Sequence, residues 1–388
     1  MVKGPLSQIG PYRVEARIGS GGMATVYRAV REDHSASDRP VALKVLHPEL
    51  CKSPEYTDMF HAEGELASRL SHPVLVSVTD RGVIDNTHYM AMDLLEGQTL
   101  AELYDHFRKK KRSFPVPHTL WILARVLDGL HFAHSLTLSD GQPCNVVHRD
   151  LSPRNIVLTR TGEVRLLDFG IARSEVRKGQ TQIGIVKGTV PYMAPEQARG
   201  EALDRRCDVF GVGIVLHQLL TDSFPLDCKA TDAQRNALAL EQIKPQLKRI
   251  HLSLRGIVTR SLQTEPEQRY DSAEEMATAL RKALDKHYPK HRPEMLGALI
   301  SQTLRRQTRP RKGRQQRAPT QTRPSLKARH DSRIQKALRH QIPSVILDPE
   351  RYPPLPVVAP WDAARTLSLL ATLLVLSGLM YVFIPLAT

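Results

Sequence analysis

The chain has 388 residues, of which 41% are hydrophobic, and a formal net charge of +15. This length accommodates one large domain or two ordinary ones with a well-buried core. The four cysteines show neither CxxC nor Cys/His spacing, which argues against a zinc site and indicates free thiols in a reducing compartment. Residues 301–340 hold 13 Lys and Arg and one acid, a charge of +12, so the rest of the chain carries only 15 − 12 = +3.

The first hundred residues predict a small β-rich region with one helix. A glycine-rich turn at residues 18–22 lies between two β-prone runs, and residues 55–70 form the expected helix, which ends before His72-Pro73. The expected strands lie at residues 12–17, 25–30, 40–46, 75–81 and 88–94.

Beyond residue 100 the apolar pattern becomes helical. Residues 119–135 place leucine and valine at helical spacing, and three further apolar stretches follow at residues 207–220, 252–262 and 272–284. The pattern therefore predicts an α+β fold with a small β-rich lobe and a larger helical lobe, which together form one domain over residues 12–285.

The sequence after residue 285 predicts a segment that attaches the domain to a membrane. Residues 286–341 are basic and rich in Gln, Arg and Pro, so we expect them to be mostly disordered, and residues 342–365 form a Pro-rich spacer. Residues 366–386 are uncharged and apolar over a length that spans a bilayer, which predicts a transmembrane helix. The first ten residues lack a long apolar core, so we expect no signal peptide.

Two N-terminal motifs have ordinary explanations when taken singly. The turn Gly19-Ser20-Gly21-Gly22-Met23-Ala24 could cover phosphates with its backbone N–H groups, but glycine-rich turns are common. Lys44 ends the apolar run Val41-Ala42-Leu43, and a buried ammonium there needs anionic partners, for which Glu63 is the candidate. The alternative is an edge-strand lysine with a solvated head.

The motifs gain meaning from their order along the chain. His148-Arg149-Asp150 is followed by Asn155, then by Asp168-Phe169-Gly170 and by Ala194-Pro195-Glu196. One carboxylate at this spacing can orient a hydroxyl nucleophile, while an Asp and an Asn hold Mg²⁺ against ATP. The set indicates phosphoryl transfer.

With these motifs, residues 12–285 resemble the eukaryotic-type protein kinase domain, and within it the Ser/Thr kinases of myxobacteria and related bacteria. The resemblance implies a bilobal protein kinase-like fold, ATP and Mg²⁺ as cofactors, and protein substrates. It implies catalytic roles for Asp150, Lys44 and Glu63, and metal ligation by Asn155 and Asp168. The nucleotide-binding positions that it implies are Ile18, Gly19, Ser20, Gly21, Gly22, Met23, Ala24, Val26, Ala42, Lys44, Met92, Asp93, Leu95 and Val157.

Ser152 and Arg154 depart from the family pattern, while Arg149 and Thr181 concern the regulation that the resemblance implies. Ser152 stands where Ser/Thr kinases usually carry a Lys that neutralises the γ-phosphate, and we hypothesise that Arg154 supplies that charge; the alternative is a surface Arg. Arg149 beside Asp150 implies control by a phosphorylated loop. Within residues 171–190 we favour Thr181 as the phosphosite, against an ordinary solvated threonine.

The sequence therefore predicts a single-pass membrane kinase with its catalytic domain in the cytoplasm, since the basic block should stay on that side. The alternative is a pseudokinase scaffold that binds partners at the membrane without catalysis. For residues 301–340 we rank contact with anionic lipids first, a solvated linker second and nucleic acid last, because interleaved aromatics are missing. A homodimer could support autophosphorylation in trans.

Overall fold

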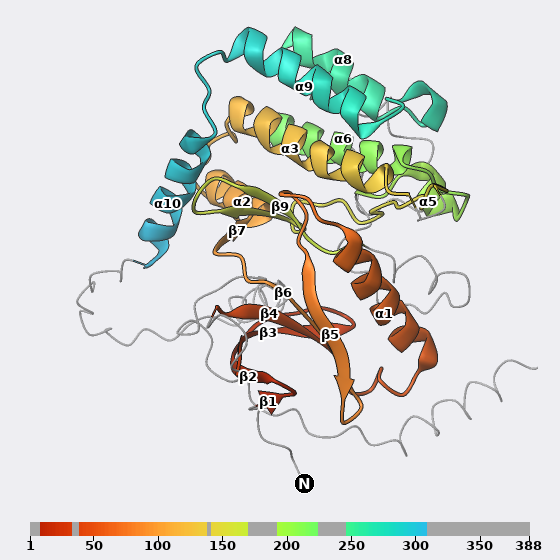
Figure 1. Cartoon of the computed structure of the whole chain (residues 1–388). Helices are drawn as coiled ribbons and strands as arrows, with labels where there is room; N and C mark the ends of the chain where they lie inside the picture. The colour runs from red at the N-terminus through yellow and green to blue at the C-terminus, as the bar shows by residue number, and fades with distance from the viewer. Residues whose placement is uncertain (1–7, 33–38, 138–140, 170–191, 224–245, 309–388) are drawn as a thin grey trace, which may run out of the picture. The chain divides into compact units, whose positions relative to one another are not determined.

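The computed structural model describes residues 8–32, 39–137, 141–169, 192–223 and 246–308 (Figure 1). The chain divides into two compact units, residues 1–348 and 349–388, and every described residue belongs to the first. In these ranges no helix combines the length and the apolar character needed to cross a bilayer. The predicted spacer at 342–365 and the predicted transmembrane helix at 366–386 lie outside the described residues.

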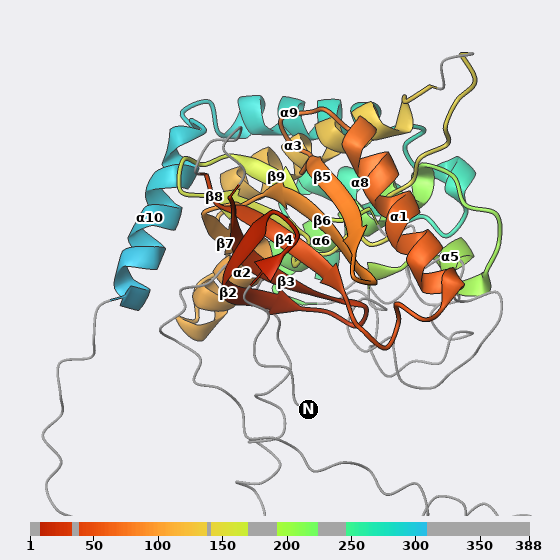
Figure 2. The same cartoon turned by 60° about the horizontal axis from the view of Figure 1, so that its bottom comes forward.

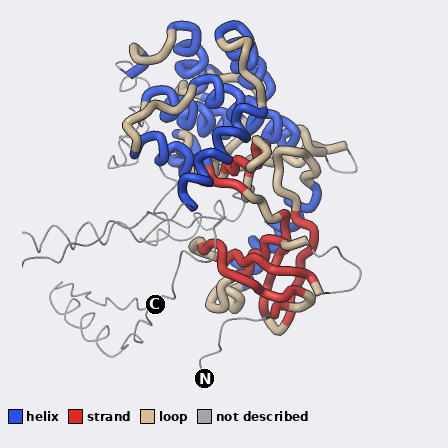
Figure 3. Tube along the Cα trace, turned by 90° about the vertical axis from the view of Figure 1, so that its left-hand side faces the viewer, coloured by secondary structure: helices blue, strands red, loops and turns tan. Residues whose placement is uncertain are grey.

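The described chain forms the two lobes that the sequence predicts, with strands gathered at one end and helices at the other (Figure 3). In the N-terminal lobe, six described strands form an antiparallel sheet in the order β1-β2-β3-β4-β6-β5. Their bounds are β1 Gln8–Ile9, β2 Tyr12–Ser20, β3 Ala24–Arg31, β4 Val41–Leu46, β5 Val78–Ile84 and β6 Thr87–Asp93.

The one described helix of this lobe, α1 (Pro54–Arg69), lies beside the sheet (Figures 1 and 2). Pro54 occupies its first turn, where the missing N–H costs nothing. Its buried face consists of Met59, Phe60, Glu63 and Gly64. Three of these are apolar or small, so the burial of a glutamate among them points to a cationic partner.

The C-terminal lobe is built around two central helices, α3 (Val116–His134) and α6 (Arg206–Thr221). Nearly every residue of α6 is buried, as expected for a helix that runs through a core. The other described helices of this lobe are α2 Leu100–Lys109, α5 Pro195–Arg199, α8 Leu252–Ser261, the 3-10 turn η3 Pro266–Gln268, α9 Ala273–His287 and α10 Glu294–Thr308.

A small sheet of three described strands, β7 (Gly97–Thr99), β8 (Ile156–Thr159) and β9 (Val164–Leu166), lies where the lobes meet. β7 follows the segment that joins the two lobes, and β8 follows the loop of residues 148–155, here called the catalytic loop because it holds the predicted catalytic residue Asp150. An isolated bridge between Leu75 and Leu166 and a hydrogen bond from the Val76 N–H to the Leu166 carbonyl (3.2 Å) connect β9 to the N-terminal lobe.

Part of the segment 286–341, which the sequence predicts to be mostly disordered, is helical: residues 294–308 form α10. Leu296 and Ile300 are fully buried and Leu299 is partly buried, at helical spacing. Arg, Gln and Pro dominate the composition after residue 304, and averaging over the whole segment hid this apolar stripe. The rest of the predicted disordered segment, apart from residues 286–293, lies outside the described residues.

Candidate active site

The ammonium of Lys44, on β4, lies between two carboxylates. Its Nζ lies 2.5 Å from Glu63 Oε1 on α1 and 3.3 Å from Asp168 Oδ1, which follows β9. Burial alone would lower the pKa of Lys44, but Asp168 and Glu63 offset it and raise that pKa above its usual value. Lys44 therefore stays charged, and the contact with Glu63 fixes α1 against the sheet.

The buried imidazole of His148 holds the catalytic loop through both ring nitrogens. His148, fully buried, has its Nε2 at 2.9 Å from the Leu167 carbonyl oxygen, so that nitrogen donates. Its Nδ1 is then left to accept the Asp150 N–H at 3.2 Å. Asn155 Nδ2 donates to Asp150 Oδ2 (2.9 Å) and to the Asp150 carbonyl oxygen (2.8 Å). The Asp150 carboxylate is thus oriented by the amide beside it.

A buried carboxylate on α6 anchors the same loop. Asp208 accepts hydrogen bonds from the His148 and Arg149 N–H groups (2.8 and 2.9 Å) and from His134 Nε2 (2.8 Å). Burial alone would raise the pKa of Asp208, but the hydrogen bond from His134 and the others lower it below its usual value. These bonds hold Arg149 at φ +66°, a left-handed backbone that costs free energy in a non-glycine residue.

An apolar pocket lies beside Lys44 and holds about 430 Å³ of empty space that is continuous with solvent. Val157 is completely buried next to it, in one cluster with Leu95 and Leu167. A flat aromatic base fits between such apolar walls. The residues that line the pocket are Val26, Ala42, Lys44, Met92, Asp93, Leu94, Leu95, Leu167 and Asp168.

The glycine-rich turn closes the β2–β3 hairpin. Gly21 N–H donates to the Ala24 carbonyl oxygen (2.8 Å), and Ile18, Met23 and Val26 pack in the apolar cluster that lies next to this pocket. The predicted phosphate-covering turn, Gly19 to Ala24, is therefore a strand–turn–strand element. No helix follows it, which distinguishes it from a dinucleotide-binding fingerprint.

Other predicted positions lie apart from these contacts. Arg154 is exposed and makes no hydrogen bond or ion pair with another described residue. Ser152 is 1% exposed, and its hydroxyl finds no partner among the described atoms. Thr181 and Gly170 lie outside the described residues.

A second buried ion pair supports the helical lobe. Glu196 of α5 and Arg269 form a bidentate pair at 2.6 and 2.7 Å, and the guanidinium lies 4.8 Å from the centre of the Phe210 ring. Removing either partner would leave a buried charge, so the pair is structural. It positions α5, whose Gln197 Nε2 donates to the Arg149 carbonyl oxygen at 2.7 Å.

Sequence analysis missed three supporting residues. Leu167 forms part of the pocket wall, and the sequence signal for it was its place directly before Asp168. His134 and Gln197 hold the catalytic loop from distant elements, at 2.8 Å and 2.7 Å, and nothing in their local sequence indicates this.

The donor set suits ATP with Mg²⁺. The described residues contain no group of three or more His, Cys, Asp or Glu side chains that could hold a metal by themselves. Mg²⁺ is usually bound by one or two carboxylates together with waters and substrate phosphates, so Asp168 and Asn155 fit such a site. Lys44 adds the positive charge that phosphates need.

Comparison with known proteins agrees with this geometry. The family model described as "Protein kinase domain" matches residues 12–302. The chain is 37% identical over 298 residues to the tyrosine-protein kinase MasK of Myxococcus xanthus, covering 76% of this chain and 46% of MasK. It is 32% identical over 283 residues to the serine/threonine-protein kinase PrkC of Bacillus subtilis, covering 71% of this chain and 41% of PrkC.

A solved structure is similar over almost its whole length. The kinase domain of PknI from Mycobacterium tuberculosis aligns with a TM-score of 0.52 and 29% identity, covering 73% of this chain and 99% of that one. The chain spans less than half of the length of the curated relatives that it matches. The resemblance to bacterial kinases is confirmed, and the chain belongs to the protein kinase family.

Proposed function

We propose that this chain is an active protein kinase that transfers the γ-phosphate of ATP to serine or threonine hydroxyls of protein substrates. The observation that carries this proposal is the joined arrangement of Lys44 with Glu63 and Asp168, next to Asp150 held by Asn155. A pseudokinase usually lacks part of this set, so the complete set favours catalysis over the scaffold alternative.

Each of these side chains has a task in the transfer. Asp150, oriented by Asn155, accepts or orients the proton of the substrate hydroxyl. Lys44, held between two carboxylates, contacts the α- and β-phosphates. Asp168 and Asn155 would hold Mg²⁺, which neutralises phosphate charge when bound. The apolar pocket excludes water from the adenine.

The hydroxyl specificity has two candidates. PrkC is named a serine/threonine-protein kinase, and MasK is named a tyrosine-protein kinase. Arg154, four residues after Asp150, stands at the offset at which many tyrosine kinases place an Arg. Ser/Thr members of the family use a Thr at the position of Thr189, after Gly188, to bridge the catalytic Asp, so we place Ser/Thr specificity first. Phosphoamino-acid analysis of the autophosphorylated chain separates the two, since phosphotyrosine alone would overturn our choice.

Control by autophosphorylation at Thr181 is part of the proposal. Arg149 is only partly exposed, and its Nε finds no partner among the described atoms. Its backbone is fixed on both sides, by Asp208 and by Gln197. With its backbone fixed in this way, Arg149 can offer its guanidinium to a phosphate. Mass spectrometry of the active chain should find phosphate on Thr181.

Comparing γ-phosphate transfer by the wild type with Asp150→Ala tests the catalytic proposal. We expect transfer to fall by several orders of magnitude in Asp150→Ala and to stay unchanged in Asp285→Ala, an exposed carboxylate on α9. Transfer that survives in Asp150→Ala would show that the assigned aspartate is wrong. A wild type that binds ATP without transferring phosphate would support the scaffold.

We further propose that residues 366–386 tether the kinase to the cell membrane with its catalytic domain in the cytoplasm. Residues 301–340, with 13 cations and one acid, would then contact anionic lipids at about 1 kcal/mol per cation. Tethering raises the local concentration of catalytic domains, which favours autophosphorylation within a homodimer. Its partners are protein substrates and lipids, with nucleic acid last.

A further inference from the structure

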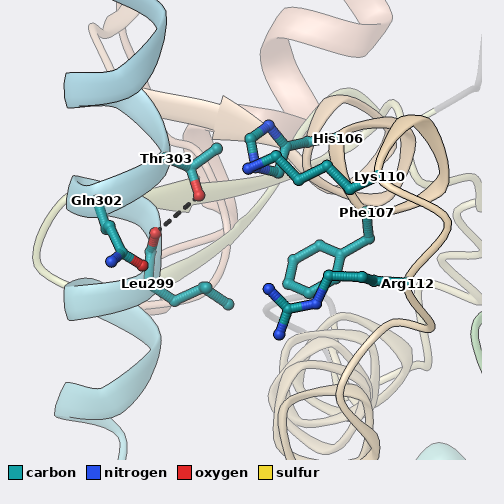
Figure 4. Close-up of a pocket in the computed structure, with 7 residues that line it drawn as sticks. All are labelled: His106, Phe107, Lys110, Arg112, Leu299, Gln302 and Thr303. Carbon is teal, nitrogen blue, oxygen red and sulfur yellow. Dashed lines mark hydrogen bonds between the residues drawn. The ribbon is translucent and has the colours of Figure 1, made fainter.

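A second pocket lies outside the active site, between the end of α2 and α10, and has about 310 Å³ of empty space that is continuous with solvent (Figure 4). Figure 4 shows side chains from the two helices facing each other across it. No carboxylate is among the lining residues. They are His106, Phe107, Lys110, Arg112, Leu299, Gln302 and Thr303.

The α10 wall of this pocket is firmly attached to the domain. Gly297 lies against the turn that joins β8 and β9, where an added Cβ would stand 2.9 Å from the Thr161 carbonyl carbon and oxygen. Reciprocally, a Cβ on Gly162 would stand 2.9 Å from the Gly297 nitrogen. Two backbones in such close contact leave α10 little freedom to move toward α2 or away from it.

The α2 wall carries an unusual density of positive charge. Residues 108–112 read Arg-Lys-Lys-Lys-Arg, and all five are exposed. Arg108 pairs with Asp222 at 3.4 Å, whereas Lys109, Lys110, Lys111 and Arg112 form no ion pair with a described residue. Cations in the last turn stabilise a helix dipole, but α2 ends at Lys109, so the later ones lie beyond that benefit.

The polar groups inside the pocket suit a phosphate. Arg112 lies over the Phe107 ring at 5.8 Å, which orients its guanidinium without using its hydrogen-bond donors. Lys110 adds an ammonium, and Gln302 adds an amide that can donate. Thr303 donates to the Leu299 carbonyl oxygen at 2.9 Å, so it completes the wall and contributes no donor (Figure 4).

We propose that this pocket binds the phosphate headgroup of an anionic phospholipid and so holds the kinase domain against the membrane surface. A single phosphopeptide could fill the pocket but would leave the flanking cations and the +12 block at 301–340 unmatched. That block begins within α10 and continues beyond it, so two like-charged regions need one extended anionic surface. The inference rests on the proposed membrane tether and does not depend on catalysis.

Hydrogen–deuterium exchange of the full chain tests the pocket. The chain is mixed with preformed nanodiscs of phosphatidylcholine alone or with an equal part of phosphatidylglycerol. We expect amides of residues 106–113 and 299–304 to exchange about fivefold more slowly on the anionic discs. The double variant Lys110→Glu/Arg112→Glu should lose this protection. Lys282→Glu/Lys286→Glu, the same charge change on exposed α9 residues, should keep it.

The same samples separate failure of the tether from failure of the pocket. Co-elution with neutral discs reports the tether alone, and protection on anionic discs reports the pocket whether or not the tether holds. Equal exchange on both discs would overturn the proposal. The proposal would also be overturned if phosphatidylglycerol gave no protection while excess inorganic phosphate, a phosphopeptide or a single-stranded oligonucleotide protected the same amides on neutral discs. If the α9 control also lost protection, the slower exchange would come from the net charge of the chain and not from the pocket, which would overturn the proposal.

Discussion

Ser152 stands in the catalytic loop where Ser/Thr kinases of the family usually carry a lysine that neutralises the γ-phosphate. Since serine is uncharged, Arg154 is the candidate for that role. Ser152 is buried and uncharged, and Arg154 is exposed with no ion-pair partner among the described residues. We predict that Arg154→Ala lowers kcat about tenfold or more, because a transition-state charge contact is lost. Steady-state kinetics should show kcat retained in Arg154→Lys and in Arg249→Ala, an exposed control. Full turnover in Arg154→Ala would make Arg154 a surface residue.

Another residue-scale prediction concerns pH. His118 Nδ1 lies 3.1 Å from His291 Nε2, and burial together with His291 lowers the pKa of His118 to about 4. Between these two pKa values, His118 binds a proton in the unfolded chain, where a His pKa is near 6.5, but stays unprotonated in the folded chain. The contribution of the unprotonated His118 to the free energy of unfolding is therefore fully present above about pH 6.5. It is lost as the pH falls toward 4, and the loss is about 2 kcal/mol at pH 5.

Thermal unfolding at pH 7 and pH 5 checks this sign. The wild type should unfold at a lower temperature at pH 5, and His118→Phe should show a smaller difference between the two pH values. His131→Phe, on the same helix but partly exposed, serves as the control and should keep the wild-type difference. An unchanged pH dependence in His118→Phe would contradict the assignment.

At the scale of elements, the contact of α10 with the β8–β9 turn can be tested with two helical glycines. An alanine at Gly297 places its Cβ 2.9 Å from backbone atoms, whereas around Gly256 on α8 the space is open. Alanine favours a helix over glycine by about 1 kcal/mol. We predict that Gly256→Ala raises the unfolding temperature and that Gly297→Ala lowers it. Stabilisation by both changes would mean that α10 is loosely attached.

The shift of the β8–β9 turn that an alanine at Gly297 forces should also affect nucleotide binding. The Arg160 N–H, in the β8–β9 turn, donates to the Glu96 carbonyl oxygen at 3.1 Å, directly after the pocket residue Leu95. Ser301 of α10 donates to the Arg160 carbonyl oxygen at 3.4 Å. We therefore expect Gly297→Ala to raise KM for ATP more than it lowers kcat. An unchanged KM would confine the role of α10 to stability.

The elements that the sequence predicted well are those whose pattern is local. The β2–β3 hairpin, β4 with its embedded Lys44, and α1 follow from alternation, a glycine-rich turn and a helix stop at His72-Pro73. Helix α10 was not predicted, because its apolar stripe lies in a segment where charged and polar residues dominate. The supports His134 and Gln197 could not be predicted, because each acts on a loop that only the tertiary fold brings near.

At the scale of the whole molecule, charge and apolar character are segregated along the chain. The +12 of residues 301–340 and the uncharged run at 366–386 would act together, because an apolar span gives attachment and the basic block adds an electrostatic contact that salt weakens. We predict that the wild type stays in the membrane fraction at high salt. Leu374→Arg/Leu376→Arg, which costs about 3 kcal/mol per charge at the bilayer centre, should release it.

Cell fractionation with a catalytic readout measures both parts of that prediction. The double Arg variant should appear in the soluble fraction at high salt and return to anionic vesicles at low salt, because the basic block is intact. Its kcat on a soluble peptide should equal that of the wild type, since the catalytic groups lie within residues 44–168. Retention in the membrane fraction at high salt would show that the span is not the attachment and that a protein partner holds the kinase there.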